Sequence, residues 1–180
     1  HVASKNETAS DLAIKAAERL FAKGEVSRDE IDYVLFCTQS PDYFLPTSAC
    51  IIQDKLGLRR NIGALDFNLG CSGYVYGLSL AKGLISCGVA NSVLLLTGET
   101  YNKHLHPKDK GNRTIFGDAA SATVISTNGI SEIGDFSLGT DGSGADNLIV
   151  RSGGMRIPEK RCDLSFDENN NPVSSDYLYM

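Results

Sequence analysis

Cys71 is the residue of this sequence whose type and setting best fit covalent chemistry. It follows a predicted buried strand at residues 62–67 and precedes a predicted helix at residues 72–86. The free N–H groups at a helix N-terminus favour negative charge on sulfur and can hold the oxyanion of an attached acyl group. Gly70 and Gly73 would let a substrate approach the backbone closely. Cys71 is therefore our candidate nucleophile; the alternative is a small buried core residue.

A cysteine nucleophile needs a base, and the sequence offers few candidates. His104 and His106 lie in a predicted polar loop at residues 101–113. Because no cluster of further ligands accompanies them, we expect no metal site and favour a solvated pair. An α/β-hydrolase elbow is discounted, since that motif needs a glycine two residues before the nucleophile, where this sequence has Leu69. Cys71 thus resembles half of a catalytic apparatus.

Three other motifs have a structural and a functional interpretation. Small residues at 117–122 permit close packing of a strand, and Asp118 among them is a candidate acceptor of backbone hydrogen bonds. Residues 140–144 have the composition of a turn. A third motif is a small basic group, which consists of Lys108, Lys110 and Arg113. These side chains could contact a phosphate, but their composition favours a solvated loop face.

The elements that must position Cys71 alternate between helices and strands. The apolar pattern predicts helices at 9–21, 48–56 and 72–86, and strands at 33–37, 62–67 and 92–98. The turn signal Asn128-Gly129 predicts two further strands, at 119–126 and 130–138, that form a hairpin. The helix at 72–86 is apolar nearly all round, so we expect it to be buried on most faces.

This order of elements predicts the fold class. Alternating strands and helices followed by a hairpin indicate an α/β fold with a mixed sheet of five-stranded type and helices on both faces. Residues 140–175 contain few apolar side chains and are predicted to form a long loop within the same domain, residues 1–180.

Composition excludes several classes of function. The chain has 180 residues, 17 Lys+Arg against 22 Asp+Glu, and a formal charge of −5. The acidic balance without a basic cluster argues against nucleic-acid binding. No apolar run reaches the roughly 18–20 residues of a membrane span. The five cysteines are odd in number and form no C-x-x-C pair, which predicts a reduced, cytoplasmic protein.

Three segments together resemble one enzyme family. They are Leu69-Gly70-Cys71-Ser72-Gly73-Tyr74, Ile115-Phe116-Gly117-Asp118-Ala119-Ala120-Ser121-Ala122 and Asp141-Gly142-Ser143. In order and spacing they are similar to β-ketoacyl-acyl carrier protein synthase III, the initiating condensing enzyme of bacterial fatty acid synthesis in the thiolase superfamily. The resemblance extends from Asn6 to Met180.

The resemblance implies a thiolase-like fold and an activity. The family has a duplicated five-layer α/β/α/β/α fold and is a homodimer. Cys71 would take an acyl group from acyl-CoA as a thioester and condense it with malonyl-acyl carrier protein, with loss of CO2 and without a cofactor or metal. The family's catalytic His and Asn lie in a second half. We expect residues 1–180 to be most of the N-terminal half, lacking its first strand, and to be inactive alone.

Two positions depart from well-studied family members. Lys110 stands where they carry an Arg against the CoA adenine; because Lys stacks poorly on a flat ring, the substitution leaves room for an acyl-carrier-protein donor. Leu45 matches a position where some members have a Phe that reaches the partner's acyl pocket, so a longer or branched starter could fit.

Three alternatives remain open from the sequence. One is a related condensing enzyme of a specialised lipid or polyketide pathway. The second is a non-catalytic α/β scaffold in which Cys71 only packs. The third is a cysteine hydrolase that releases the acyl group to water.

Overall fold

The computed structural model describes residues 1–180 and divides the chain into two units. The sheet unit comprises Ala3–Glu99 and Ala119–Leu138, and the loop unit comprises His1–Val2, Thr100–Asp118 and Gly139–Met180. None of the helices has the length and apolar character needed to cross a bilayer.

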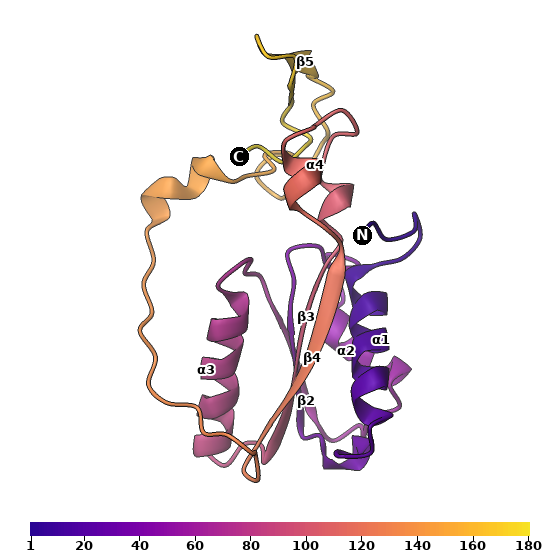
Figure 1. The fold of residues 1–180 in the computed structure, drawn as a ribbon, viewed down its shortest axis with the longest axis vertical. Coiled ribbons are helices and arrows are strands. Elements are labelled where there is room, and N and C mark those ends of the chain that lie inside the picture. Colours follow the sequence, from indigo (N-terminus) through magenta and orange to yellow (C-terminus); the bar gives the residue numbers. More distant parts are fainter. The chain divides into compact units, whose positions relative to one another are not determined.

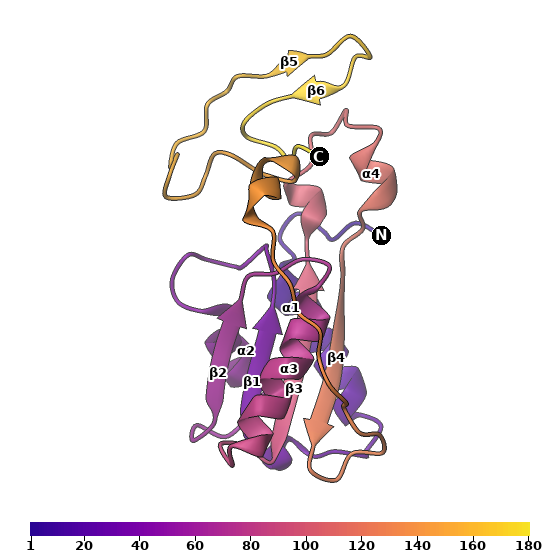
Figure 2. The same cartoon turned by 90° about the vertical axis from the view of Figure 1, so that its left-hand side faces the viewer.

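The sheet unit is a mixed four-stranded sheet with helices on both faces (Figures 1 and 2). Its strands lie in the order β2-β1-β3-β4; β1, β2 and β3 are parallel, and β4 is antiparallel to β3. The α/β fold class is therefore confirmed. The strands are β1 (Tyr33–Cys37), β2 (Gly63–Phe67), β3 (Ser92–Glu99) and β4 (Ala119–Ser126), and the helices are α1 (Ala9–Phe21), α2 (Ser48–Lys55) and α3 (Gly73–Ser86), with a short 3-10 turn η1 (Arg28–Glu30).

Two apolar clusters lie on opposite faces of the sheet, because successive side chains of a strand point to opposite sides. Val34 and Phe36 pack with α1 and α2. Leu35 packs with α3. Both β1 and the middle of β3 are buried on both faces, as the unbroken apolar runs predict for central parallel strands. Figure 1 shows α3 on one side of the sheet and α1 with α2 on the other.

Small residues allow α1 to lie close to β3 and β4, as the sequence predicts. A Cβ atom added to Gly98 would lie 2.9 Å from the backbone oxygen of Ala9 and 3.3 Å from the Cβ of Ala120. Helix α1 begins at the predicted residue, where Thr8 and Asp11 form a reciprocal capping box.

The predicted strand at residues 130–138 is wrong, and the sheet has four strands rather than five. The chain does turn after β4, where the Gly129 N–H donates to Ser126 O over 3.3 Å. However, apolar residues recur at intervals near three instead of two, so one face of a strand could not bury them. Lys82 of α3 instead binds the backbone oxygens of Ile133 and Gly134, at 2.8 and 2.9 Å.

The prediction that α3 is buried on most faces is also wrong. Only Gly73, Gly77 and Ala81 of this helix are buried, and they face the sheet, where a Cβ on Gly77 would lie 2.6 Å from Leu95 Cδ1. Large apolar side chains on its other faces are exposed, among them Tyr74, Val75 and Leu80. The helix is apolar nearly all round, but in residues 1–180 only the sheet and the segment after β4 pack closely against it. Its remaining apolar faces are therefore exposed.

The loop unit contains only short elements. They are η2 (Tyr101–Lys103), α4 (Asn112–Ile115), η3 (Gly142–Asn147) and the two-residue strands β5 (Ser165–Phe166) and β6 (Pro172–Val173), which pair antiparallel. Asp118 is buried and accepts hydrogen bonds from the backbone and side chain of Asn102, at 3.0 and 3.2 Å. It is thus the anchor that the sequence predicts. Asp141 accepts the Ser143 N–H at 2.9 Å, as expected for turn chemistry.

Candidate active site around Cys71

Cys71 lies in a tight turn at the N-terminal end of α3. The turn is closed by the Gly73 N–H, which donates to Gly70 O over 2.9 Å. The Cys71 side chain is exposed. The turn follows β2 at the carboxyl edge of the parallel strands, where α/β proteins generally place their functional groups. Cys71 is therefore accessible to a reactant at the position the sequence predicts, and it is not a buried core residue.

Cys37, the last residue of β1, packs against this turn. Its thiol donates to Leu69 O over 3.1 Å. A Cβ atom on Gly73 would lie only 2.2 Å from Cys37 Sγ, so this position has room for glycine alone. Burial raises the pKa of the Cys37 thiol from its ordinary 9.0 to about 11, which keeps it protonated at neutral pH. Cys37 is consequently a structural cysteine, as the sequence predicts.

The two thiols should differ strongly in reactivity. At pH 8, a pKa of about 11 leaves Cys37 with about a hundredfold less thiolate than a thiol of pKa 9.0. Because burial raises the pKa of Cys37 and also shields its sulfur, we expect iodoacetamide to label the exposed Cys71 at least about tenfold faster than Cys37, as measured by peptide mass spectrometry over time.

Cys87 is the matched control for that measurement. It is also exposed, and it lies at the opposite end of α3, where the helix dipole disfavours negative charge. Labelling of Cys71 no faster than Cys87 would contradict the assignment of Cys71 as an activated nucleophile.

The other predicted site residues lie in different units. Leu45 is in the sheet unit, in the loop between β1 and α2, and is 86% exposed. Lys110 is exposed and belongs to the loop unit. The sequence did not single out Gln39 and Glu99, which lie at or just beyond the carboxyl ends of β1 and β3. Their position at the same sheet edge as Cys71 was the available signal.

The two histidines are not the solvated pair that the sequence favours. Both are half-buried. The His106 ring lies edge-on to Tyr177, with centroids 4.9 Å apart, and His104 is edge-on to Tyr101 at 6.0 Å. Aromatic packing explains their burial better than solvation does. No group of three or more His, Cys, Asp or Glu side chains in the chain is arranged to hold a metal ion.

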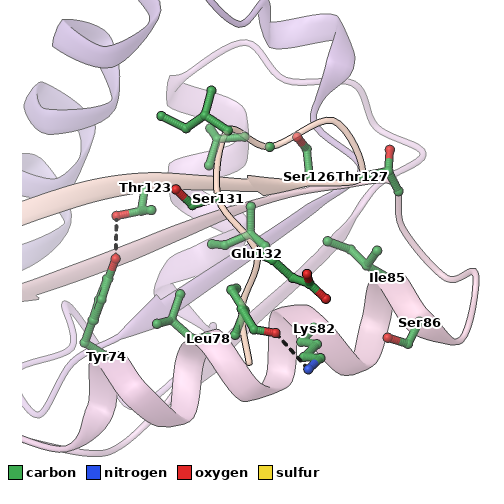
Figure 3. A pocket seen from close by; sticks show the side chains of 15 residues that line it. Tyr74, Leu78, Lys82, Ile85, Ser86, Thr123, Ser126, Thr127, Ser131 and Glu132 are labelled. Atoms are coloured by element: carbon green, nitrogen blue, oxygen red, sulfur yellow. Dashed lines mark hydrogen bonds between the residues drawn. The ribbon is translucent and has the colours of Figure 1, made fainter. Parts of the chain in front are cut away.

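A groove of about 510 Å³ lies within the sheet unit between α3, β4 and the segment after β4 (Figure 3). The Tyr74 hydroxyl crosses part of the groove to contact the Thr123 hydroxyl at 3.3 Å. At its edge, the Lys82 ammonium donates to the backbone oxygens of Ile133 and Gly134. Cys71 is not among its lining residues. The candidate chemistry therefore belongs to the exposed turn and not to this groove.

Comparison with known proteins finds similarity to one group of condensing enzymes. The family model described as 3-oxoacyl-[acyl-carrier-protein (ACP)] synthase III matches residues 65–142, the stretch that contains Cys71. A β-ketoacyl-[acyl-carrier-protein] synthase III of Clostridium perfringens is 37% identical over 178 residues, covering 98% of this chain and 52% of the relative. Over nearly its whole length the chain is therefore similar to synthase III enzymes. It spans about half the length of the relatives that it matches.

Solved structures of synthase III enzymes have the same fold. A crystal structure of a 3-oxoacyl-(acyl-carrier-protein) synthase III superposes with a TM-score of 0.96 at 53% identity, covering all of this chain and 55% of the other. The 3-oxoacyl-(acyl-carrier protein) synthase of Burkholderia xenovorans gives 0.85 at 38% identity, covering all of this chain and 50% of that one. The thiolase-like fold implied by the resemblance is confirmed.

Proposed function

We propose that the full-length protein is a condensing acyltransferase that starts fatty acid synthesis. The Cys71 thiolate attacks the thioester carbonyl of an acyl-CoA, and the CoA thiolate leaves. Malonyl-acyl carrier protein then loses CO2, and the carbanion formed attacks the acyl group on Cys71. Cys71 leaves as thiolate and is regenerated, while the product stays on the carrier protein.

One observation carries this proposal: the exposed Cys71 occupies a glycine turn at the N-terminus of α3, within the residues that match the synthase III model. Free N–H groups at the start of a helix favour both a thiolate and the oxyanion of the tetrahedral intermediate. A thiol is also a good leaving group, so one residue serves both half-reactions. Neither step requires a metal or a cofactor. The catalytic His and Asn that the resemblance implies would come from outside these residues.

Intact mass spectrometry of the full-length protein after incubation with short acyl-CoAs tests the first half-reaction. We expect a one-acyl mass increase that is lost in Cys71→Ala. A purified protein that acquires no acyl group from CoA or carrier-protein donors would refute the proposal and favour the scaffold interpretation. Release of the acyl group to water without C–C bond formation would favour the hydrolase.

The partners in this proposal are acyl-CoA, acyl carrier protein and a second copy of the chain in a cytoplasmic homodimer. Tyr43, Phe44 and Leu45 form a consecutive exposed apolar segment, with 63%, 73% and 86% of each residue accessible. Such a segment is typical of a surface that a partner covers. Lys110 contributes charge to a phosphate of the donor without stacking on its ring.

Leu45 sets the size of the starter unit in this proposal. We expect Leu45→Phe to shift preference at least about fivefold toward short acyl groups, since a larger rigid ring fills space that a longer chain needs, and one methylene alone is worth about 10-fold or more. Competition between acetyl-CoA and a branched or longer acyl-CoA, scored by product mass, measures the shift. Unchanged preference would reject this role.

A further inference from the structure

Glu99 is a partly buried carboxylate for which the proposed mechanism has no use. It is the last residue of β3, and burial raises its pKa. None of the ion pairs in the chain includes it. Its oxygens instead accept the Gln39 N–H and the Ser40 hydroxyl, both at 2.7 Å. The Thr38 side chain and the Ser40 backbone also hydrogen-bond to Glu99. Because a carboxylate is costly to withdraw from water unless it is hydrogen-bonded, these contacts with residues 38–40 hold Glu99 in place.

The residues that Glu99 binds lie just beyond the end of a strand. The pairing of β1 with β2 ends at Cys37 opposite Phe67, and one further bond joins the Thr38 N–H to Phe67 O at 3.2 Å. Gln39 comes next, and the strand pairing no longer fixes its backbone. Glu99, reaching across from the neighbouring strand, supplies that constraint.

Gln39 in turn touches the turn that carries the nucleophile. A Cβ atom on Gly70 would lie 2.8 Å from the side-chain oxygen of Gln39, so the Gln39 amide lies directly against Gly70. Gly70 also closes the turn by accepting the Gly73 N–H. A chain of contacts therefore runs from Glu99 through Gln39 to the residue before Cys71.

We propose that Glu99 is a positioning residue for Cys71, acting through the backbone and side chain of Gln39. The inference rests on the proposed function, since positioning matters only if Cys71 reacts. It deepens that function by naming two further residues on which the reaction depends. A displacement of about 1 Å at a reacting group can cost about a hundredfold in rate, so losing this support should be visible in kinetics.

The test uses single-turnover transfer from acetyl-CoA to Cys71 in the full-length protein. We expect Glu99→Ala to lower the transfer rate constant at least about tenfold, with the acetyl-CoA concentration for half-maximal rate changed less than twofold. Glu99→Gln keeps an oxygen for the Gln39 N–H and should recover most of the rate. If Glu99 were needed only for folding, its loss would not lower the transfer rate constant while leaving the acetyl-CoA concentration for half-maximal rate unchanged.

Gln39→Ala tests whether Glu99 acts through Gln39. It removes the amide against Gly70 but keeps the backbone N–H that Glu99 accepts, so it should lower the rate about as much as Glu99→Ala. If Glu99 acts through Gln39, the double variant should be no slower than the slower single variant. Additive losses, or a Glu99→Ala rate within twofold of wild type in protein that circular dichroism shows to be folded, would overturn the proposal.

A separate readout distinguishes failure of the proposed function. If acetyl-CoA acylates no form of the protein, the iodoacetamide rate of Cys71 relative to Cys87 still reports the geometry of the turn. We expect that ratio to change at least about threefold in Glu99→Ala and Gln39→Ala alike. An unchanged ratio in both variants would reject positioning independently of the acyl donor.

Discussion

Cys71→Ser should abolish condensation by the full-length protein, lowering kcat by on the order of 10⁴-fold or more, as loss of a covalent nucleophile does in other enzymes. Serine keeps the size of the side chain and the exposed turn, so folding should be unaffected. It fails because a hydroxyl ionises far less readily than a thiol and alkoxide is a poor leaving group for the second half-reaction. The rate of malonyl-acyl carrier protein-dependent product formation measures the effect.

Cys87→Ser is the matched control for this prediction. Cys87 is an exposed cysteine at the other end of α3, so the same exchange there should leave kcat within about twofold, as expected for a surface substitution. A Cys71→Ser protein that retains a tenth of the wild-type rate would show that the acyl group does not pass through this residue.

Gly73→Ala should destabilise the protein by about 3 kcal/mol, the upper end of the cost of overpacking a tight site. The new Cβ would lie 2.2 Å from Cys37 Sγ and 3.3 Å from Leu69 Cβ, so the start of α3 must shift. That shift moves the turn carrying Cys71 and should also slow acyl transfer. Thermal or denaturant unfolding of the full-length protein measures the change in stability.

A compensating variant makes this prediction specific. In the double variant Cys37→Ala, Gly73→Ala the obstructing sulfur is absent, and the nearest remaining atom of residue 37 lies 3.7 Å away, an ordinary contact. The double variant should therefore be more stable than Gly73→Ala by at least about 1 kcal/mol, a coupling typical of residues in contact. If the two substitutions simply add, the clash is not the cause of the destabilisation.

Local pattern was sufficient for the elements that build the Cys71 site. Continuous apolar runs identify β1 and β3 because a central parallel strand is buried on both faces. The capping residues and the apolar spacing locate α1, and Gly70 and Gly73 mark the turn before α3. Each of these features is encoded within a few neighbouring residues, so a single sequence suffices to predict them.

Pattern failed where distant segments compete for the same surface. Residues 130–138 follow a good hairpin turn, yet their apolar spacing does not suit a strand, and Lys82 of α3 binds their backbone instead. The apolar surface of α3 predicts burial, but burial also needs an element to pack against, which helical periodicity does not supply. Likewise, His106 lies in a polar stretch of sequence but packs against Tyr177, 71 residues later along the chain.

The sequence by itself predicted the α/β fold class from local periodicity, and it predicted the candidate nucleophile from the glycines that flank Cys71. The likeness to synthase III came from the resemblance of three segments and not from periodicity. Only the tertiary structure decided how that nucleophile is held. The bond from Cys37 to Leu69 and the contacts from Glu99 through Gln39 to Gly70 join residues about 30 to 60 positions apart. Such pairings arise from strand order and register, which no local pattern of side chains specifies.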